Sequence, residues 1–222
     1  CGDVACRTVR PSPPCCTQHS GSWDGANTAS LLRFAAERGD PLAAVAYGNE
    51  ISGEHGIGAS LRAGEYAAGL QELRAIVKSV WARAGRLSAA PRVIGPNAQQ
   101  LDLKWMANLL AYDVGLTTVS HHVYPLGAGS ASPTSLFGRI LRPEFLDKLG
   151  QAAAHLREGL ATIAHGVAND LAPRLTVEEE AALRARGAPE LWVTEMGGAY
   201  NSGSPSVTDA FASSLWFADA LG

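Results

Sequence analysis

Four apolar runs, separated by longer stretches of helical periodicity, dominate the hydrophobic pattern of the chain. Short apolar runs bounded by glycine or proline predict buried strands, here over residues 42–47, 92–95, 117–124 and 190–193. We expect the second run to stop at Pro96, because proline cannot donate to a strand ladder. Strands that alternate with helices are typical of an α/β fold with a parallel sheet.

The segments between these runs carry apolar residues at spacings of three and four, which predicts amphipathic helices. The helices are expected over residues 24–38, 63–84, 101–114, 143–168 and 208–221. In the first helix, Asn27 or Thr28 is the expected cap. The faces expected to be buried comprise Leu31, Leu32, Phe34 and Ala35 in the first helix, Tyr66, Leu70, Leu73, Val77, Val80 and Trp81 in the second, and Phe211, Leu215, Trp216 and Leu221 in the last.

Two of the predicted strands end in a carboxylate beside a glycine. Glu50 follows the first strand and Gly48, and Glu195 follows the fourth strand and precedes Gly197 and Gly198. The two glutamates are 145 residues apart (195 − 50), which leaves room for about three βα units and would bring both strand ends to one barrel mouth. Paired carboxylates at one mouth indicate glycoside hydrolysis. The alternative is a charged strand terminus before an ordinary turn.

Composition narrows the classes of function. The net charge of −3, with 46% hydrophobic and 18% charged residues, indicates a folded domain and argues against nucleic-acid binding. No apolar run reaches the length of about 18 residues that a membrane span requires. An anionic sugar remains possible as a substrate, because one uronate needs only a local pocket.

Metal binding is not expected. All four cysteines, Cys1, Cys6, Cys15 and Cys16, lie within residues 1–20, and their spacing fits no standard zinc pattern, so this segment is interpreted as a disordered tail. His121 and His122 are adjacent on a predicted strand, so at most one of them faces the interior. No third ligand stands at a suitable spacing from them.

Three motifs together resemble glycoside hydrolase family 79, and most closely its plant-type heparanase-like β-glucuronidases. They are GNE at 48–50, SHHVYPLGAG at 120–129, and WVTEMGGAYNSG at 192–203 followed by FASSLWFADALG at 211–222. The resemblance covers residues 22–222 and implies a (β/α)8 TIM barrel. A complete barrel takes about 250 residues. With four predicted strands, residues 21–222 are expected to be a partial catalytic domain holding about strands 4–7, with an insertion at 169–189.

The resemblance also implies roles for individual residues. It makes Glu195 the nucleophile and Glu50 the acid/base of a retaining glycosidase, a choice that their positions at strand ends leave open. Asn49 would bind the sugar 2-hydroxyl, and His121 and Tyr124 would lie in the sugar subsite. Residues 96–99 would approach the site.

Selection of a uronic acid is implied for the segment after the nucleophile. By resemblance, backbone N–H groups of Tyr200, Asn201, Ser202 and Gly203 hold the sugar carboxylate. The expected substrate is therefore a β-glucuronide or a glycan containing glucuronic acid, cleaved without a metal or other cofactor. Secretion, or delivery to a lysosome or vacuole, is implied as well, although the chain starts at Cys1 without a secretory signal.

Two departures from the family pattern support a rival hypothesis. Val45, Ala46 and Tyr47 replace the usual Trp-Glu-Leu before Gly-Asn-Glu, and Thr194 stands where a glycine is usual. The rival is a truncated, non-catalytic remnant that binds sugar. Retention of Asn49, Glu50 and Glu195 favours the enzyme.

Overall fold

The computed structural model describes residues 23–52, 60–99, 101–112, 115–164 and 176–221. The cysteine-rich tail and the first part of the expected insertion lie outside these residues. The elements are α1 (Ala26–Arg38), β1 (Ala44–Ala46), α2 (Ala63–Arg83), the 3-10 helix η1 (Leu87–Ala89), β2 (Arg92–Ala98), α3 (Leu103–Tyr112), β3 (Thr118–Val123), α4 (Pro133–Ile140), α5 (Pro143–Leu146), α6 (Lys148–Ala164), α7 (Val177–Arg186), β4 (Glu190–Met196) and α8 (Ser213–Leu221).

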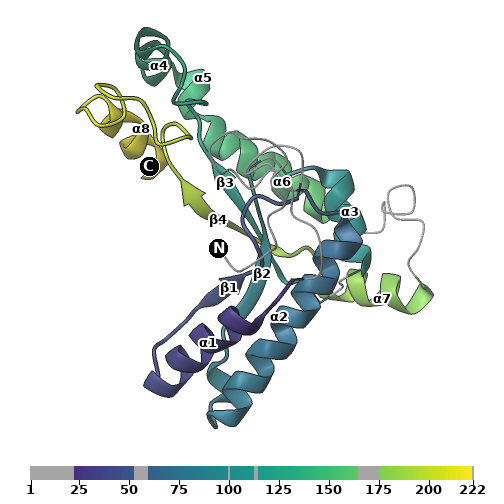
Figure 1. Ribbon diagram of the computed structural model, residues 1–222. Coiled ribbons are helices and arrows are strands. Elements are labelled where there is room, and N and C mark those ends of the chain that lie inside the picture. The colour runs from purple at the N-terminus through teal and green to yellow at the C-terminus, as the bar shows by residue number, and fades with distance from the viewer. Residues whose placement is uncertain (1–22, 53–59, 100, 113–114, 165–175, 222) are drawn as a thin grey trace, which may run out of the picture.

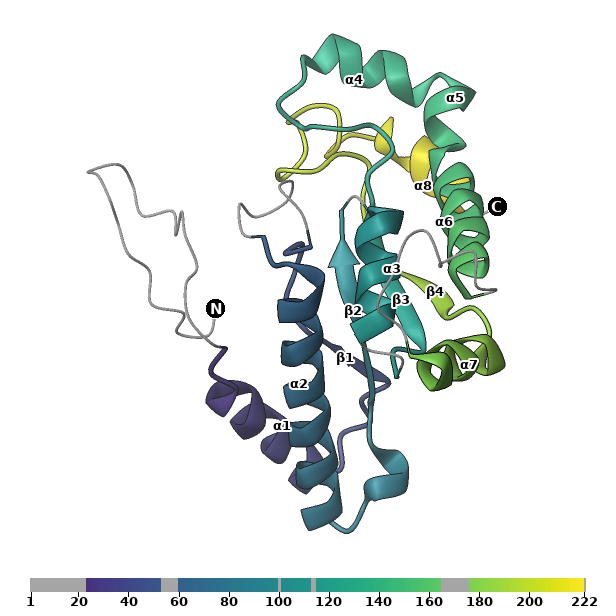
Figure 2. The same ribbon diagram turned by 90° about the vertical axis from the view of Figure 1, so that its right-hand side faces the viewer.

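The strands form one curled parallel sheet in chain order, β1-β2-β3-β4. Helices α2, α3 and α6 lie along the same face of this sheet (Figures 1 and 2). Parallel strands joined in order through helices on one face are the construction of a (β/α)8 barrel. The expected α/β class is confirmed, and the described residues are compatible with part of such a barrel.

The main core lies between the sheet and these helices. The predicted stripe of α2, from Tyr66 to Trp81, is buried throughout, as the spacing of three and four indicated. It packs with Met106 and Leu110 of α3, Leu160 of α6 and other buried residues. Truncating a fully buried leucine in such a core costs about 2–5 kcal/mol, so this layer holds the strand ends in place.

A second, smaller core lies beyond the carboxyl ends of β3 and β4. Leu126, Leu136, Ile140, Ala199 and Val207 are its buried members, and Trp216 of α8 packs against them. Figure 1 shows α4, α5 and α8 gathered there, away from α1 and α2. This small core supports the segment that follows β4.

The helix ends and faces differ from expectation in several places. Helix α1 begins after Gly25, and the Asp24 side chain accepts the Ala26 N–H at 2.9 Å, so neither Asn27 nor Thr28 caps it. Leu32 and Ala35 of α1 are buried, whereas Leu31 and Phe34 are exposed, because the helix packs mainly against α2 alone. The face of the last helix that was expected to be buried is mostly exposed. Of its four residues, only Trp216 packs against the second core, and the exposed ones are Phe211, Leu215 and Leu221.

Two strands also differ from the prediction. Strand β2 continues through Pro96 to Ala98. Its pairing with β1 ends at Ile94, so at Pro96 only β3 remains as a partner and the missing N–H is tolerated. Strand β4 has β3 on one side only, and its residues are mostly exposed rather than buried.

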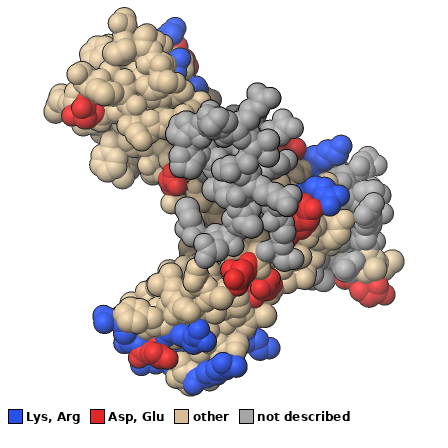
Figure 3. Space-filling model, viewed as in Figure 1, with Lys and Arg blue, Asp and Glu red and all other residues tan. Residues whose placement is uncertain are grey.

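Surface charge agrees with the composition. In the view of Figure 3, the Lys and Arg side chains over α1 and α2 are interspersed with acidic ones and form no continuous stripe. Among the described segments, no helix combines the length and apolar character needed to cross a bilayer.

Candidate active site

Three ionisable side chains from different strand ends meet at one point of the sheet. His122 Nδ1 of β3 lies 2.7 Å from Glu50 Oε1 and 3.7 Å from Glu195 Oε2. One ligand atom from each of the three lies within 4.8 Å of the other two. The two carboxylates that are 145 residues apart in sequence (195 − 50) are therefore neighbours in space, as their positions at parallel strand ends predicted.

Glu50 is held by the turn that follows β1. Its backbone takes a left-handed conformation, with φ 53°, and its N–H donates to the carbonyl of Asn97 at 3.0 Å. The Glu50 side chain is 12% exposed, and that of His122 is 1% exposed. This carboxyl is thus enclosed and directly hydrogen-bonded to an imidazole that can accept or hold a proton.

Glu195 is more open to solvent, with 46% of its side chain exposed. The hydroxyl of Tyr124 donates a hydrogen bond to its Oε1. Burial, together with that hydrogen bond and the charges of Glu195 and Glu50, raises the pKa of the Tyr124 hydroxyl above its usual range. Tyr124 therefore remains a protonated donor to the carboxylate at acid and neutral pH, and its expected place in the sugar subsite stays a prediction.

The structure places His122 against the carboxylates, and not His121, which the sequence analysis favoured for the sugar subsite. Alternation along β3 allows only one of them to reach the site. His121 is 2% exposed, and its Nε2 has no hydrogen-bond partner among the described residues. Burial lowers the pKa of His121, which favours the neutral imidazole.

The segment after β4 approaches the carboxylates from one side. The rings of Tyr200 and Tyr124 meet edge to face with centroids 6.1 Å apart. Tyr200 pairs through its backbone with the segment after β3, donating to the Gly127 carbonyl at 3.0 Å and accepting from the Gly129 N–H at 2.9 Å. Tyr200 thereby lies beside the ring that touches Glu195.

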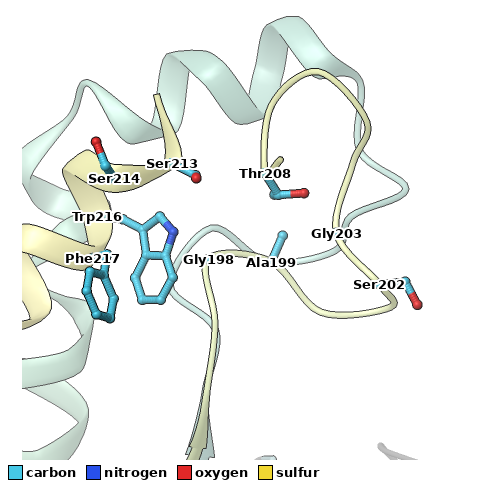
Figure 4. Close-up of a pocket in the computed structure, with 9 residues that line it drawn as sticks. All are labelled: Gly198, Ala199, Ser202, Gly203, Thr208, Ser213, Ser214, Trp216 and Phe217. Atoms are coloured by element: carbon cyan, nitrogen blue, oxygen red, sulfur yellow. The ribbon is translucent and has the colours of Figure 1, made fainter. Parts of the chain in front are cut away.

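Three residues after Tyr200 turn the chain sharply. Asn201, Ser202 and Gly203 have φ values of 57°, 63° and 72°, and the first two are exposed. A pocket of about 450 Å³ lies between this turn and α8, and its lining includes Ser202, Gly203 and Trp216 (Figure 4). The expected uronate-binding residues therefore sit together on one loop, with Tyr200 nearest to the carboxylates.

The two glycines that begin this segment permit close packing. A Cβ on Gly197 would lie 3.0 Å from the Tyr124 ring, and one on Gly198 would lie 2.6 Å from the Trp216 indole nitrogen. Glycine is the residue that allows such close approach of backbone to a ring.

Asn49 is exposed in the turn after β1, beside Glu50. Its side chain makes no hydrogen bond to any other residue in the described part of the chain. It is therefore available to a ligand in front of Glu50.

The carboxylates and His122 could also hold a divalent cation, because imidazole and carboxylate are metal ligands. No third ligand stands near the two histidines in sequence. The structure instead brings Glu50 and Glu195 to His122 from distant strands. In the described arrangement His122 Nδ1 is already paired with Glu50 at hydrogen-bonding distance.

Sequence reasoning missed the residues that connect these strand ends. Asn97 accepts a hydrogen bond from the Glu50 backbone, and its own side chain accepts one from the Thr194 hydroxyl at 2.9 Å. The buried Ser120 hydroxyl accepts the Asn97 N–H at 3.0 Å. The only signal in the sequence was the resemblance that brought residues 96–99 near the site.

Comparison with known proteins places the chain in a family. The family model described as "Glycosyl hydrolase family 79, N-terminal domain" matches residues 12–170 and 177–222, beginning earlier than the resemblance seen in the sequence. The chain belongs to glycosyl hydrolase family 79. Among curated relatives, it is 31% identical over 203 residues to heparanase-like protein 3 of Arabidopsis thaliana, covering 91% of this chain and 32% of the relative.

Two further relatives give the same picture. Heparanase-like protein 2 of Arabidopsis thaliana is 28% identical, covering 93% of this chain and 33% of the relative. Baicalin-beta-D-glucuronidase of Scutellaria baicalensis is 26% identical, covering 91% of this chain and 33% of the relative. The chain thus spans about a third of the length of the curated relatives it matches.

Proposed function

We propose that the protein is a retaining glycoside hydrolase that cleaves β-glucuronides. The observation that carries this proposal is the grouping of Glu50, His122 and Glu195, with ligand atoms within 4.8 Å of one another. Retaining glycosidases hold their two carboxyl groups about 5–5.5 Å apart, whereas inverting enzymes need about 6.5–9.5 Å to admit a water between them. A carboxylate oxygen of Glu50 within 4.8 Å of one of Glu195 is closer to the spacing of a retaining pair than to that of an inverting pair, which favours direct attack by one carboxylate.

The surroundings of the two carboxylates favour different roles. Glu195 is the more exposed and receives the Tyr124 hydroxyl, a donor that stabilises its negative charge, which suits a nucleophile. Glu50 is enclosed and paired with His122, which suits a group that must gain and lose a proton during the reaction. These assignments agree with those implied by the family resemblance.

The reaction then proceeds in two balanced steps. The Glu195 carboxylate attacks the anomeric carbon while the Glu50 carboxylic acid gives its proton to the departing glycosidic oxygen, so the alcohol leaves and a glycosyl-enzyme ester remains. Glu50, now a carboxylate, takes a proton from a water molecule whose oxygen attacks the same carbon. The ester bond to Glu195 breaks, and the sugar leaves with its original configuration. The two carboxyl groups suffice for this chemistry without a metal.

The preference for a glucuronide is supported by the loop after β4. Tyr200 lies against Tyr124, and Asn201 to Gly203 follow as a left-handed turn in which Asn201 and Ser202 are exposed. Successive backbone N–H groups in such a turn are suited to bind a carboxylate. Asn49, beside Glu50, is suited to donate to the sugar 2-hydroxyl. One relative carries glucuronidase in its name, which favours the same sugar. Secretion or delivery to a lysosome or vacuole belongs to this proposal too.

The test is hydrolysis of p-nitrophenyl β-glucuronide by the full-length protein, with the β-glucoside measured beside it. We expect glucuronide turnover that falls at least about 1,000-fold in Glu195→Gln, since that change removes the attacking oxygen charge. Proton NMR of the first product should show the β-anomer. The α-anomer would refute retention, and the absence of turnover on both sugars would favour the non-catalytic sugar-binding remnant.

A matched control separates loss of chemistry from loss of fold. Glu190→Gln changes a carboxylate at the opposite end of the same strand, where Glu190 pairs with Arg92 on the surface. An exposed ion pair contributes at most about 1 kcal/mol to stability. We therefore expect Glu190→Gln to keep nearly full activity.

A further inference from the structure

Two strand irregularities face each other across β3. In the pairing of β2 with β3, Pro96 opposes Ser120 and Ala98 opposes His121, so Asn97 is an extra residue. In the pairing of β4 with β3, Val193 opposes His121 and Glu195 opposes His122, so Thr194 is an extra residue. A bulge of this kind redirects the side chain of the inserted residue.

The two inserted residues are bonded to each other although β3 separates their strands. The Thr194 hydroxyl donates to Asn97 Oδ1 at 2.9 Å. This bond joins β4, directly before Glu195, to the end of β2. It spans β3 at the level where His122 meets the two carboxylates.

Asn97 is also bonded to the segment that carries the other carboxylate. Its carbonyl accepts the Glu50 N–H at 3.0 Å, and its own N–H donates to the buried Ser120 hydroxyl at 3.0 Å. Asn97 and Glu50 both have left-handed backbones, with φ of 52° and 53°. Such conformations cost energy in residues other than glycine, and they persist only when surrounding contacts fix them.

We infer that Asn97 and Thr194 are positioning residues that set the distance between the two carboxylates. Their bond connects the backbone of Glu50, through Asn97, to the residue before Glu195. The inference rests on the proposed glycosidase function, to which it adds two residues that fix the geometry without reacting. Its consequence is that loss of the Thr194 hydroxyl slows the chemical step.

The test compares Thr194→Val, which keeps the side-chain shape and removes the hydroxyl, with Thr194→Ser, which restores the donor. Thr162→Val is the matched control, because the Thr162 hydroxyl donates to the Glu158 carbonyl within α6 at 2.9 Å, away from the sheet. With p-nitrophenyl β-glucuronide and the full-length protein, we expect Thr194→Val to lower kcat about three- to tenfold, the range given by one neutral hydrogen bond. KM should stay within about twofold, since the bond does not touch the sugar.

A second measurement reads the positioning without turnover. If the Thr194 hydroxyl fixes Asn97, removing that hydroxyl makes the Asn97 carbonyl, which accepts the Glu50 N–H, more mobile. Amide hydrogen exchange at Glu50 should then become several-fold faster in Thr194→Val than in Thr162→Val. Recovery of both kcat and exchange protection in Thr194→Ser would support the inference.

The possible failures differ from one another. An active wild-type protein whose Thr194→Val variant matches Thr162→Val in kcat overturns the positioning role. A rise in KM at constant kcat overturns it as well, because it assigns Thr194 to sugar binding. Unchanged exchange at Glu50 overturns the link through Asn97. A wild-type protein that turns over no glucuronide refutes the proposed function itself, and the positioning role falls with it.

Discussion

Replacement of Tyr124 by phenylalanine is the sharpest test of how the site would stabilise Glu195, the proposed nucleophile. The change removes one hydroxyl, the donor to Glu195 Oε1, and keeps the ring that packs edge to face against Tyr200 at 6.1 Å. The sugar-facing shape of the site is therefore preserved, while the carboxylate loses a partner.

The magnitude follows from the charge on the acceptor. A hydrogen bond to a charged group contributes about 1.5–3 kcal/mol. Since each 1.36 kcal/mol is about a tenfold change in rate, we expect kcat on p-nitrophenyl β-glucuronide to fall about ten- to 150-fold. KM should change little, because the lost bond orients the attacking group and not the bound sugar.

The assay is a steady-state comparison of wild type, Tyr124→Phe and Tyr112→Phe, the last changing a tyrosine at the end of α3. Burial and the neighbouring carboxylates raise the Tyr124 pKa, so the hydroxyl stays protonated, and the defect should be constant from about pH 6 to pH 8, a window above the ordinary carboxyl pKa of about 4.3. Equal kcat values in the three proteins would refute the assignment of Tyr124 as a donor to the nucleophile.

Three further outcomes are expected. Gly69→Ala should lower the free energy of unfolding measured in urea by about 1–2 kcal/mol, because its Cβ would lie 2.2 Å from the Tyr47 ring and this overpacking outweighs the gain in helix propensity. Gly150 has open space around it, so Gly150→Ala should raise that free energy by up to about 1 kcal/mol. Burial lowers the pKa of His121 in the folded protein below its unfolded value of about 6.5. The contribution of neutral His121 to folding stability is therefore present above that pH and is lost as the pH falls through the folded pKa. When the pH is lowered from 7 to 5, the urea midpoint of unfolding should fall less in His121→Leu than in wild type. EDTA should leave glucuronide hydrolysis unchanged, and a loss restored by a divalent cation would assign a metal to the Glu50 site.

The sequence predicted the features that depend on regular repeats. The spacing of three and four in α2 identified its buried stripe correctly, and the polar ends of parallel strands identified Glu50 and Glu195 as neighbours. Both predictions rely on geometry that is uniform along a helix or strand, so the orientation of one side chain predicts the orientation of those that follow it.

The failures occurred where that regularity breaks. A period of two says that His121 and His122 point apart, but it does not say which one faces the carboxylates. Bulges at Asn97 and Thr194 have no signature in the hydrophobic pattern, so the bond between them could not be foreseen. The exposed faces of α1 and α8 were missed for another reason: periodicity shows that a helix has an apolar stripe without showing how much of it finds a partner.

The division of the interior into two cores has a consequence for how the protein loses activity. His122 and Glu195 lie on strands of the sheet and Glu50 lies in the turn after β1, next to the large core under α2 and α3, whereas Tyr200 lies beside the small core that involves Ala199 and Trp216. A small buried cluster opens at lower free energy than a large one, and proteins often open in such parts before they unfold as a whole. Mild denaturant should therefore release the loop proposed to bind the sugar acid while Glu50, His122 and Glu195 stay assembled, so that the proposed activity would lose its selectivity for a glucuronide before it is lost altogether.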